Sequence, residues 1–107
     1  KFLRRRLLME GKTWEEGLDE VLSEIRAILI KKQHDYGHSN ILDFRELGVL
    51  VRVNDKVARL KNLLLNKKQA QNESIRDSWR DLAGYAIIAL MLENGTFELP
   101  LEEDLND

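Results

Sequence analysis

The segment LAGYAIIALML, residues 82–92, decides the fold because eleven consecutive residues there carry no charge. If residues 73–93 form one helix with about 100° between residues, this segment extends a stripe that starts with two acids, Asp77 and Asp81. The stripe comprises Asp77, Asp81, Gly84, Tyr85, Ile88 and Leu92. Acids on a solvated face would be followed by more polar residues, but this stripe becomes apolar. The pattern predicts carboxylates at the mouth of a pocket, which is how helix bundles commonly hold a divalent metal.

The composition limits the classes of protein to which the chain can belong. Its 107 residues suffice for one small domain, and a formal net charge of −2 provides no basic field for direct binding of nucleic acid. The sequence contains no cysteine, which excludes disulfides, thiolate metal sites and a cysteine nucleophile. No apolar run reaches the roughly 20 residues of a membrane span. We therefore predict no membrane contact and a cytoplasmic location.

Two helices are predicted in the first two thirds of the chain. Thr13 and Glu16 belong to a capping box, TWEE, in which each side chain satisfies a free backbone N–H, and the helix that it opens runs to about Gln33. The other helix spans residues 47–65. Its apolar face contains Leu50, Val53, Val57, Leu60 and Leu64.

The connections between the predicted helices are short. Gly37 and Asn40 mark a loop, and a short turn of helix is expected over residues 41–46. The last helix is expected to start at Asn72 or Glu73 and to stop at Gly95. These elements define three segments. Residues 1–12 form a basic N-terminal segment, residues 13–101 a single all-α domain, and residues 102–107 an acidic tail that we predict to be disordered.

The last predicted helix is apolar nearly all round, so it has to be covered on every side. Three helices from one small chain bury too little surface to cover it fully. We therefore expect an all-α helical bundle that is completed by oligomerisation, as a homodimer or a higher homo-oligomer.

Lys32 and Tyr36 continue the apolar face of the first predicted helix. A lysine at this position can extend along the helix end into water, or it can point its charge into the same cavity as the acids. The segment that follows, residues 35–40, is dense in hydrogen-bonding groups. We predict that Asp35, Tyr36 and Asn40 contribute to substrate binding.

A polar stripe runs along the second long helix, with Arg52, Asp55, Arg59 and Asn62 on one face. One reading is a solvated face with ion pairs worth about 0.2–0.5 kcal/mol each. The other reading is a pocket wall, because apolar neighbours narrow the stripe on both sides. These neighbours are Val51, Ala58 and Leu63.

Three acids, Glu73, Asp77 and Asp81, follow one another at intervals of four residues at the start of the last helix. This spacing places successive carboxylates roughly 6 Å apart, within reach of one or two hard cations. Oxygen ligands of this kind suit Mg²⁺ or Mn²⁺. Arg76 and Arg80 offer an alternative, in which they neutralise the acids as surface ion pairs.

Three segments together resemble a known family. They are KKQHDYGHSN (residues 31–40), VRVNDKVARLKNL (residues 51–63) and ESIRDSWRDLAGYAII (residues 73–88). They are similar to the nucleotide-modification-associated domain of phage and bacterial proteins. That family is in turn similar to the all-α nucleotide pyrophosphatases, which comprise the MazG enzymes, the dimeric dUTPases and the dCTP pyrophosphatases. The resemblance implies a MazG-like fold over most of the chain.

The resemblance also implies a metal site, but this sequence departs from the pattern. The wider group holds Mg²⁺ with an ExxE on one helix and an ExxD on the next. Asp55 matches the second acid of ExxE, whereas Arg52 stands at the first. Asp81 matches the final acid of ExxD, whereas Ser78 stands at its Glu. Asp77, one residue earlier, is a candidate replacement.

Three functions remain open at this point. The first is an Mg²⁺-dependent pyrophosphohydrolase that converts a nucleoside triphosphate, including modified ones, into a monophosphate and pyrophosphate. The second is a non-catalytic protein that binds or sequesters a nucleotide, and the third is a helical interaction module. For the enzyme, the expected metal ligands are Asp55, Asp77, Asp81 and Glu73, and the expected catalytic residues are Asp55, Asp81 and Lys32. The expected substrate-binding residues are Lys32, Asp35, Tyr36, Asn40, Arg52, Lys56, Arg59, Asn62 and Tyr85.

Overall fold

A computed structural model describes residues 12–71 and 73–106 of the chain, and these residues form helices joined by short connections. The order is α2 (Trp14–Tyr36), α3 (Ser39–Leu42), α4 (Arg45–Leu65) and α5 (Ile75–Asn94), followed by the 3-10 helix η1 (Glu102–Asn106). No strand occurs within these described ranges, so the all-α prediction is confirmed there. Apart from Lys12, the basic segment predicted over residues 1–12 lies outside the described residues.

The sequence signals for the start of α2 and the end of α5 are confirmed. At the start of α2, Glu16 N donates to Thr13 Oγ1 at 3.1 Å, and Thr13 N donates to Glu16 Oε1 at 3.3 Å, which completes the capping box. The helix continues past the predicted Gln33 to Tyr36. At the end of α5, Gly95 adopts φ 75°, a left-handed conformation that glycine takes without a steric penalty.

The middle connection differs from the prediction. The short helical turn is α3, Ser39–Leu42, which starts two residues earlier than predicted and ends at Leu42 instead of residue 46. The next helix, α4, begins at Arg45. Asn40 therefore lies within a helix and not in the loop that it was expected to mark. The start of α5 also differs by a residue or two. Ser74 is its N-cap and accepts a hydrogen bond from Asp77 N at 3.0 Å.

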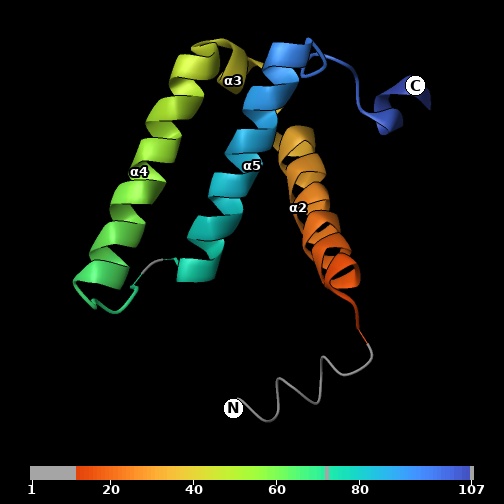
Figure 1. Ribbon diagram of the computed structural model, residues 1–107. Helices are drawn as coiled ribbons and strands as arrows, with labels where there is room; N and C mark the ends of the chain where they lie inside the picture. Colours follow the sequence, from red (N-terminus) through yellow and green to blue (C-terminus); the bar gives the residue numbers. More distant parts are fainter. Residues whose placement is uncertain (1–11, 72, 107) are drawn as a thin grey trace.

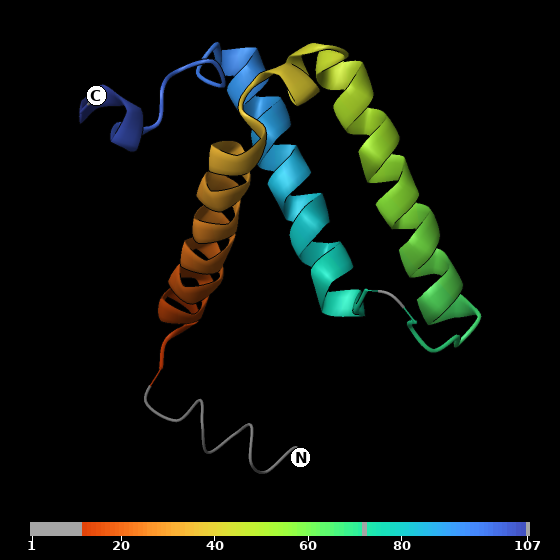
Figure 2. The same ribbon diagram turned by 180° about the vertical axis from the view of Figure 1, so that it is seen from behind.

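Helix α5 is the central element of the fold, with α4 on one side and α2 on the other (Figures 1 and 2). The main core lies at the end where α3, α4 and the segment after α5 meet. Ile41, Val49 and Phe97 are its buried members. The half-buried side chains packed against it include Tyr85 and Ile88 of α5. The apolar half of the predicted stripe on α5 is thus part of the core.

Helix α2 approaches α5 closely at a glycine. An ideal Cβ on Gly84 would lie 3.2 Å from Leu29 Cδ2, so even an alanine at this position would require the Leu29 side chain to shift by a few tenths of an ångström. Gly84 itself is buried. The close approach positions Lys32, one turn beyond Leu29 on α2, beside the first half of α5.

The predicted apolar face of α4 was partly wrong. Leu50 and Leu64 are 61% and 48% exposed, whereas the buried residues of α4 are Val49, Leu60 and Leu63. The face that meets α5 also includes two long cations, Lys56 and Arg59, that form ion pairs across the interface. The helical spacing of apolar residues alone cannot predict a buried helix face that is half apolar and half charged.

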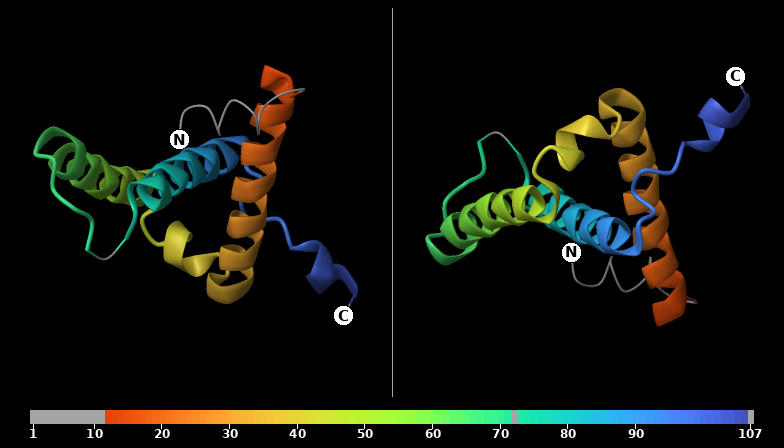
Figure 3. Two further views of the ribbon diagram at one scale, coloured as in Figure 1. Left: turned by 90° about the horizontal axis from the view of Figure 1, so that it is seen from below. Right: turned by 90° about the horizontal axis from the view of Figure 1, so that it is seen from above.

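The chain has an open shape, in which α2 and α4 diverge on either side of α5 (Figure 3). Its radius of gyration is 16.7 Å, against about 13 Å for a compact domain of this length. Its accessible surface is 8900 Å², against about 6200 Å² for a compact monomer of 12.5 kDa. No helix in the described part of the chain is both long and apolar enough to cross a membrane. In the tail, Glu103 of η1 lies 2.7 Å from His34 Nδ1.

Candidate functional site

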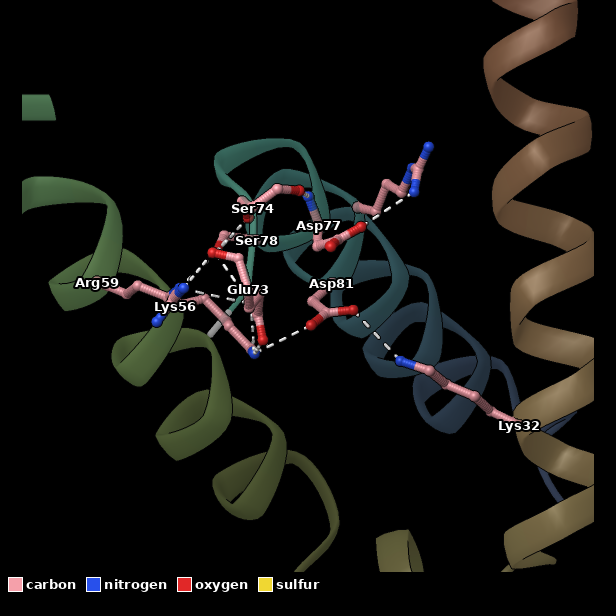
Figure 4. A network of polar contacts seen from close by, with 9 residues as sticks. Lys32, Lys56, Arg59, Glu73, Ser74, Asp77, Ser78 and Asp81 are labelled. Atoms are coloured by element: carbon pink, nitrogen blue, oxygen red, sulfur yellow. Dashed lines mark hydrogen bonds and ion pairs between the residues drawn. The ribbon is translucent and has the colours of Figure 1, made fainter. Parts of the chain in front are cut away.

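A cluster of charged side chains joins all three long helices (Figure 4). Its centre is Lys56 of α4, whose Nζ lies 3.0 Å from Glu73 Oε1 and 3.0 Å from Asp81 Oδ2. The other Asp81 oxygen lies 3.2 Å from Lys32 Nζ, which arrives from α2. Two carboxylates thus share the ammonium group of Lys56, and the ammonium group of Lys32 pairs with Asp81 from the side of α2.

Arg59 and Ser78 complete this cluster. Arg59 Nε donates to Ser78 Oγ at 3.1 Å, and Ser78 Oγ donates to Glu73 Oε1 at 2.9 Å. The Arg59 guanidinium also donates to the backbone carbonyl of Glu73. Ser78 is fully buried, so its hydroxyl works as a fixed connector between the arginine and the acid. Lys32, Lys56, Arg59, Glu73 and Asp81 together carry one net positive charge, and they are called the charged cluster below.

The local sequence explains why these residues meet. Lys56 and Arg59 are three residues apart on α4, and Ser78 and Asp81 are three apart on α5, so each pair lies on one face of its helix. Glu73 precedes the N-cap of α5 and turns back toward α4. Because α4 and α5 make the most extensive helix contact in the chain, the two faces are held against each other.

The charged cluster is ionised and half-buried. Partial burial opposes charge on Asp81, but its bonds to Lys56 and the charge of Lys32 lower the pKa of this carboxyl below its ordinary value. The bond from Lys56 does the same for Glu73, whose pKa is lowered as well. Burial opposes the charge of Lys56, but Asp81 and Glu73 outweigh this effect and raise its pKa. Both carboxylates are therefore negative and the lysine is positive at neutral pH.

The third predicted acid of α5 belongs to a different group. Asp77 Oδ1 accepts a hydrogen bond from Arg80 Nη1 at 3.0 Å. Arg80 also pairs with Glu24 of α2, and Arg76 donates to Glu24 at 2.9 Å. The arginine pairs that the sequence offered as an alternative for these acids are thus present for Asp77, whereas Asp81 is paired with lysines. The role of Glu24 could not be predicted from the sequence, because its partners are more than 50 residues away along the chain.

Several predicted site residues lie apart from the charged cluster. Asp55 and Asn62 are exposed on α4, and Asn62 accepts a hydrogen bond from Asn66 at 2.8 Å. Asp35 and Tyr36 are exposed at the end of α2. The structure therefore does not bring Asp55 to Asp81. Among the described residues, no group of three or more His, Cys, Asp or Glu side chains is arranged to hold a metal ion.

Three other predicted residues form a second polar contact, one turn before Lys56 on α4. The Arg52 guanidinium lies 6.0 Å from the centre of the Tyr85 ring, a cation–π arrangement. Arg52 Nη2 also lies 3.5 Å from the backbone carbonyl of Asn40. Arg52 precedes Lys56 by four residues, and Tyr85 follows Asp81 by four, so this contact is the next layer of the same α4–α5 interface.

Ser78 stands out in the sequence only as a departure from the family pattern. Ser78 stands where an acid was expected, yet it is the only fully buried side chain among the described residues. A small hydroxyl side chain fits this interface because Arg59 of the facing helix reaches across it and bonds to Ser78. The one indication in the sequence that Ser78 would be buried is its position four residues after Ser74, on a face of α5 that another helix has to cover.

A comparison with protein families matches the part of the chain that contains the charged cluster. A family model described as "Nucleotide modification associated domain 1" matches residues 32–92, which is more than half of the chain. The matched range begins at Lys32 and includes every residue of the charged cluster. No curated protein and no solved structure matches. The chain therefore belongs to the nucleotide modification associated domain 1 family.

Proposed function

We propose that this protein is an Mg²⁺-dependent nucleoside triphosphate pyrophosphohydrolase, which releases pyrophosphate and leaves a nucleoside monophosphate. The observation that carries the proposal is the position of Lys56 Nζ, 3.0 Å from an oxygen of Glu73 and 3.0 Å from an oxygen of Asp81. Two carboxylates that converge on one cation form a place where a divalent ion competes with an ammonium group. The family to which the chain belongs supports a nucleotide as the ligand.

The residues present fit a magnesium ion with two protein ligands. Glu73 and Asp81 are both ionised, and Glu73 directs both of its carboxylate oxygens and Asp81 one of its own at Lys56 Nζ. Mg²⁺ is often held by one or two carboxylates together with substrate phosphates and water. When bound, the ion would neutralise phosphate charge and activate water. Lys56 would then be displaced toward the phosphates.

The cations of the charged cluster fit the phosphates of the substrate. Lys32, Lys56 and Arg59 approach the two acids from α2 and α4. Preorganised positive groups of this kind stabilise charge that develops on a transferred phosphoryl group. In this proposal Lys56 changes partner when substrate binds, from the two carboxylates to a phosphate oxygen.

Metal-independent nucleotide binding is the second candidate function, and it also rests on a specific observation. Ser78, at the position of an acid in the wider group, is 0% exposed and bonded to Arg59 and Glu73. Arg52, at the position of another acid, brings a positive charge instead. Both departures favour anion binding over metal binding, so a protein that binds a nucleotide without cleaving it would carry this cluster unchanged.

One assay separates the two candidates. The protein is incubated with the four common dNTPs, the NTPs and base-modified dNTPs in the presence of Mg²⁺, and pyrophosphate and monophosphate are measured. Release of both in equal amounts, abolished by EDTA, supports the hydrolase. Binding in isothermal titration calorimetry that persists in EDTA, with no product, supports the second candidate. If no nucleotide binds or is cleaved, both candidates fail.

We also propose that the functional form is a homodimer or a higher homo-oligomer, which completes a MazG-like bundle. The first half of α2 supports this proposal, because Trp14, Leu18, Val21 and Leu22 form a stripe and are 77%, 41%, 47% and 48% exposed. A stable dimer buries about 800 Å² on each partner, and the exposed apolar side chains of this stripe offer surface for such burial. A second copy seated on this stripe would cover it.

The substitution Leu22→Glu tests this oligomer. A charge in the centre of the α2 stripe opposes burial against another copy, so we expect the variant to dissociate at least tenfold more readily than the parent protein. Light scattering after size exclusion, over a range of concentrations, measures the mass in solution. Leu65→Glu is the matched control, because Leu65 is 75% exposed at the far end of α4. Equal masses for both variants and the parent protein would contradict the proposal.

A further inference from the structure

A cavity of about 320 Å³ lies at the elbow between α3 and α4. Its volume is at the lower end of the range for small-molecule sites. The walls are mainly apolar, with Ile41, Phe44 and Val49 among them, and its two longest polar side chains are Asn40 and Arg52. This cavity is called the elbow pocket below. The elbow pocket is formed within one chain by α3, α4 and the turn between them.

Asn40 shows that the elbow pocket is built for a polar partner. Its side-chain Oδ1 is buried, and no group that the structure describes donates a hydrogen bond to it. A buried acceptor without a donor costs free energy, so proteins rarely retain one without a use. Asn40 lines the elbow pocket, so a rotation of its side-chain amide would let Oδ1 accept a hydrogen bond from an N–H group of a bound ligand. The edges of all nucleobases carry such a donor, next to a flat apolar ring.

Arg52 connects the elbow pocket to the charged cluster. It lines the pocket, donates toward the Asn40 carbonyl at 3.5 Å and lies over the Tyr85 ring at 6.0 Å. Lys56 and Arg59 follow it on the same face of α4, four and seven residues later. At 1.5 Å per residue, the distance from Arg52 to Arg59 along the helix axis is about 10 Å. An elongated ligand can therefore touch the pocket and the cluster together.

We infer that the elbow pocket binds the nucleobase of the nucleotide whose phosphates bind at the charged cluster, and that Asn40 Oδ1 accepts a hydrogen bond from the base. The inference rests on the proposed function for its phosphate site, and it adds the position of the base. The base lies between apolar walls, the sugar lies beside Arg52 and Tyr85, and the phosphates extend along α4 toward Lys56 and Arg59.

Isothermal titration calorimetry with two kinds of probe tests this inference. The four dNTPs contain base, sugar and phosphates, whereas inorganic tripolyphosphate contains only phosphates, and all are titrated with Mg²⁺ present. The dNTPs are used as their α,β-imido analogues, which the proposed reaction cannot cleave. We expect the best dNTP to bind at least tenfold more tightly than tripolyphosphate. In Asn40→Leu, which keeps the volume and removes the acceptor, we expect that dNTP to lose at least tenfold in affinity while tripolyphosphate is unchanged.

The same variant separates a ligand role from a structural one. Because Asn40 Oδ1 has no donor in the folded chain that the structure describes, its removal should leave the melting temperature of the free protein unchanged or raise it. Asn54→Leu, at an exposed position of α4, is the matched control and should keep full affinity. Val51→Trp is a second test, because it places a large ring at the exposed wall of the pocket and should weaken the dNTP alone.

The outcomes distinguish this inference from the proposed function. If tripolyphosphate binds and Asn40→Leu changes dNTP affinity by less than tenfold, the elbow pocket is not the base site. An equal loss for tripolyphosphate in Asn40→Leu also overturns the inference, because the variant would then act on the phosphates. If neither tripolyphosphate nor any dNTP binds the parent protein, the proposed function itself fails.

Discussion

Asp81→Asn is expected to reduce pyrophosphate release by about a hundredfold or more, which corresponds to about 2.7 kcal/mol of lost stabilisation of the transition state. The substitution keeps the shape of the side chain and removes its charge. Asp81 is bonded by Lys56 on one oxygen and by Lys32 on the other, so its charge holds both lysines in place. The loss of this charge weakens the proposed metal site and releases both lysines. Steady-state kinetics of pyrophosphate release measures the effect.

Two kinds of control accompany Asp81→Asn. Asp19→Asn makes the same chemical change at an exposed position of α2 and should leave activity unaltered. Asp55→Asn and Asp77→Asn address the larger metal set that the sequence predicts. Because Asp55 is exposed and Asp77 pairs with Arg80, we expect either change to cost less than tenfold. Losses as large as that of Asp81→Asn would show that all these acids hold the metal together.

Lys56→Met is expected to lower the free energy of unfolding by about 1–3 kcal/mol. Met fills similar space but leaves Glu73 and Asp81, which share this lysine, as neighbouring negative charges. The Lys56 side chain is only 20% exposed, so water replaces the lost ammonium group incompletely. Urea unfolding followed by circular dichroism measures the change. Lys61→Met, at an exposed position of the same helix, should change stability by no more than about 0.5 kcal/mol.

The parent protein and Lys56→Met are also expected to differ in how their stability falls at acid pH. The pKa values of Glu73 and Asp81 are lower in the folded protein than in the unfolded chain, where they are about 4.3 and 3.9. Their contribution to stability is therefore present above these unfolded values and is lost as pH falls through the lower folded values. Between pH 5 and pH 3, the parent protein should lose stability more steeply than Lys56→Met. Parallel pH profiles would show that Lys56 does not lower these pKa values.

Much of the fold could be predicted from the sequence because its helix signals are local. The capping box at Thr13 and the stop at Gly95 each depend on residues within one turn, and both are confirmed. The uncharged run that opened the sequence analysis does form the central helix. The connection between α2 and α4 was less well predicted, because Arg45 starts α4 from a left-handed conformation, φ 51°, that sequence patterns disfavour.

The site was predicted in part, and the missing part depends on contacts between distant segments. The sequence indicated Lys32, Lys56, Arg59, Glu73 and Asp81, and the structure brings all of them together. It also indicated Asp55, which is exposed on α4. Periodicity within one helix carries no information about which of its polar residues the partner helix covers.

The most direct measurement for the central claim is a titration of ¹⁵N-labelled protein with Mg²⁺ and an α,β-imido dNTP, which the proposed reaction cannot cleave, followed by two-dimensional NMR. If the nucleotide binds at the charged cluster, the largest shifts should occur at the backbone amides around Lys56, Arg59 and Asp81, with smaller ones around Asn40. The amides of residues 14–22 on α2 should move little. Shifts that concentrate on that part of α2, or that are absent at saturating nucleotide, would contradict the account.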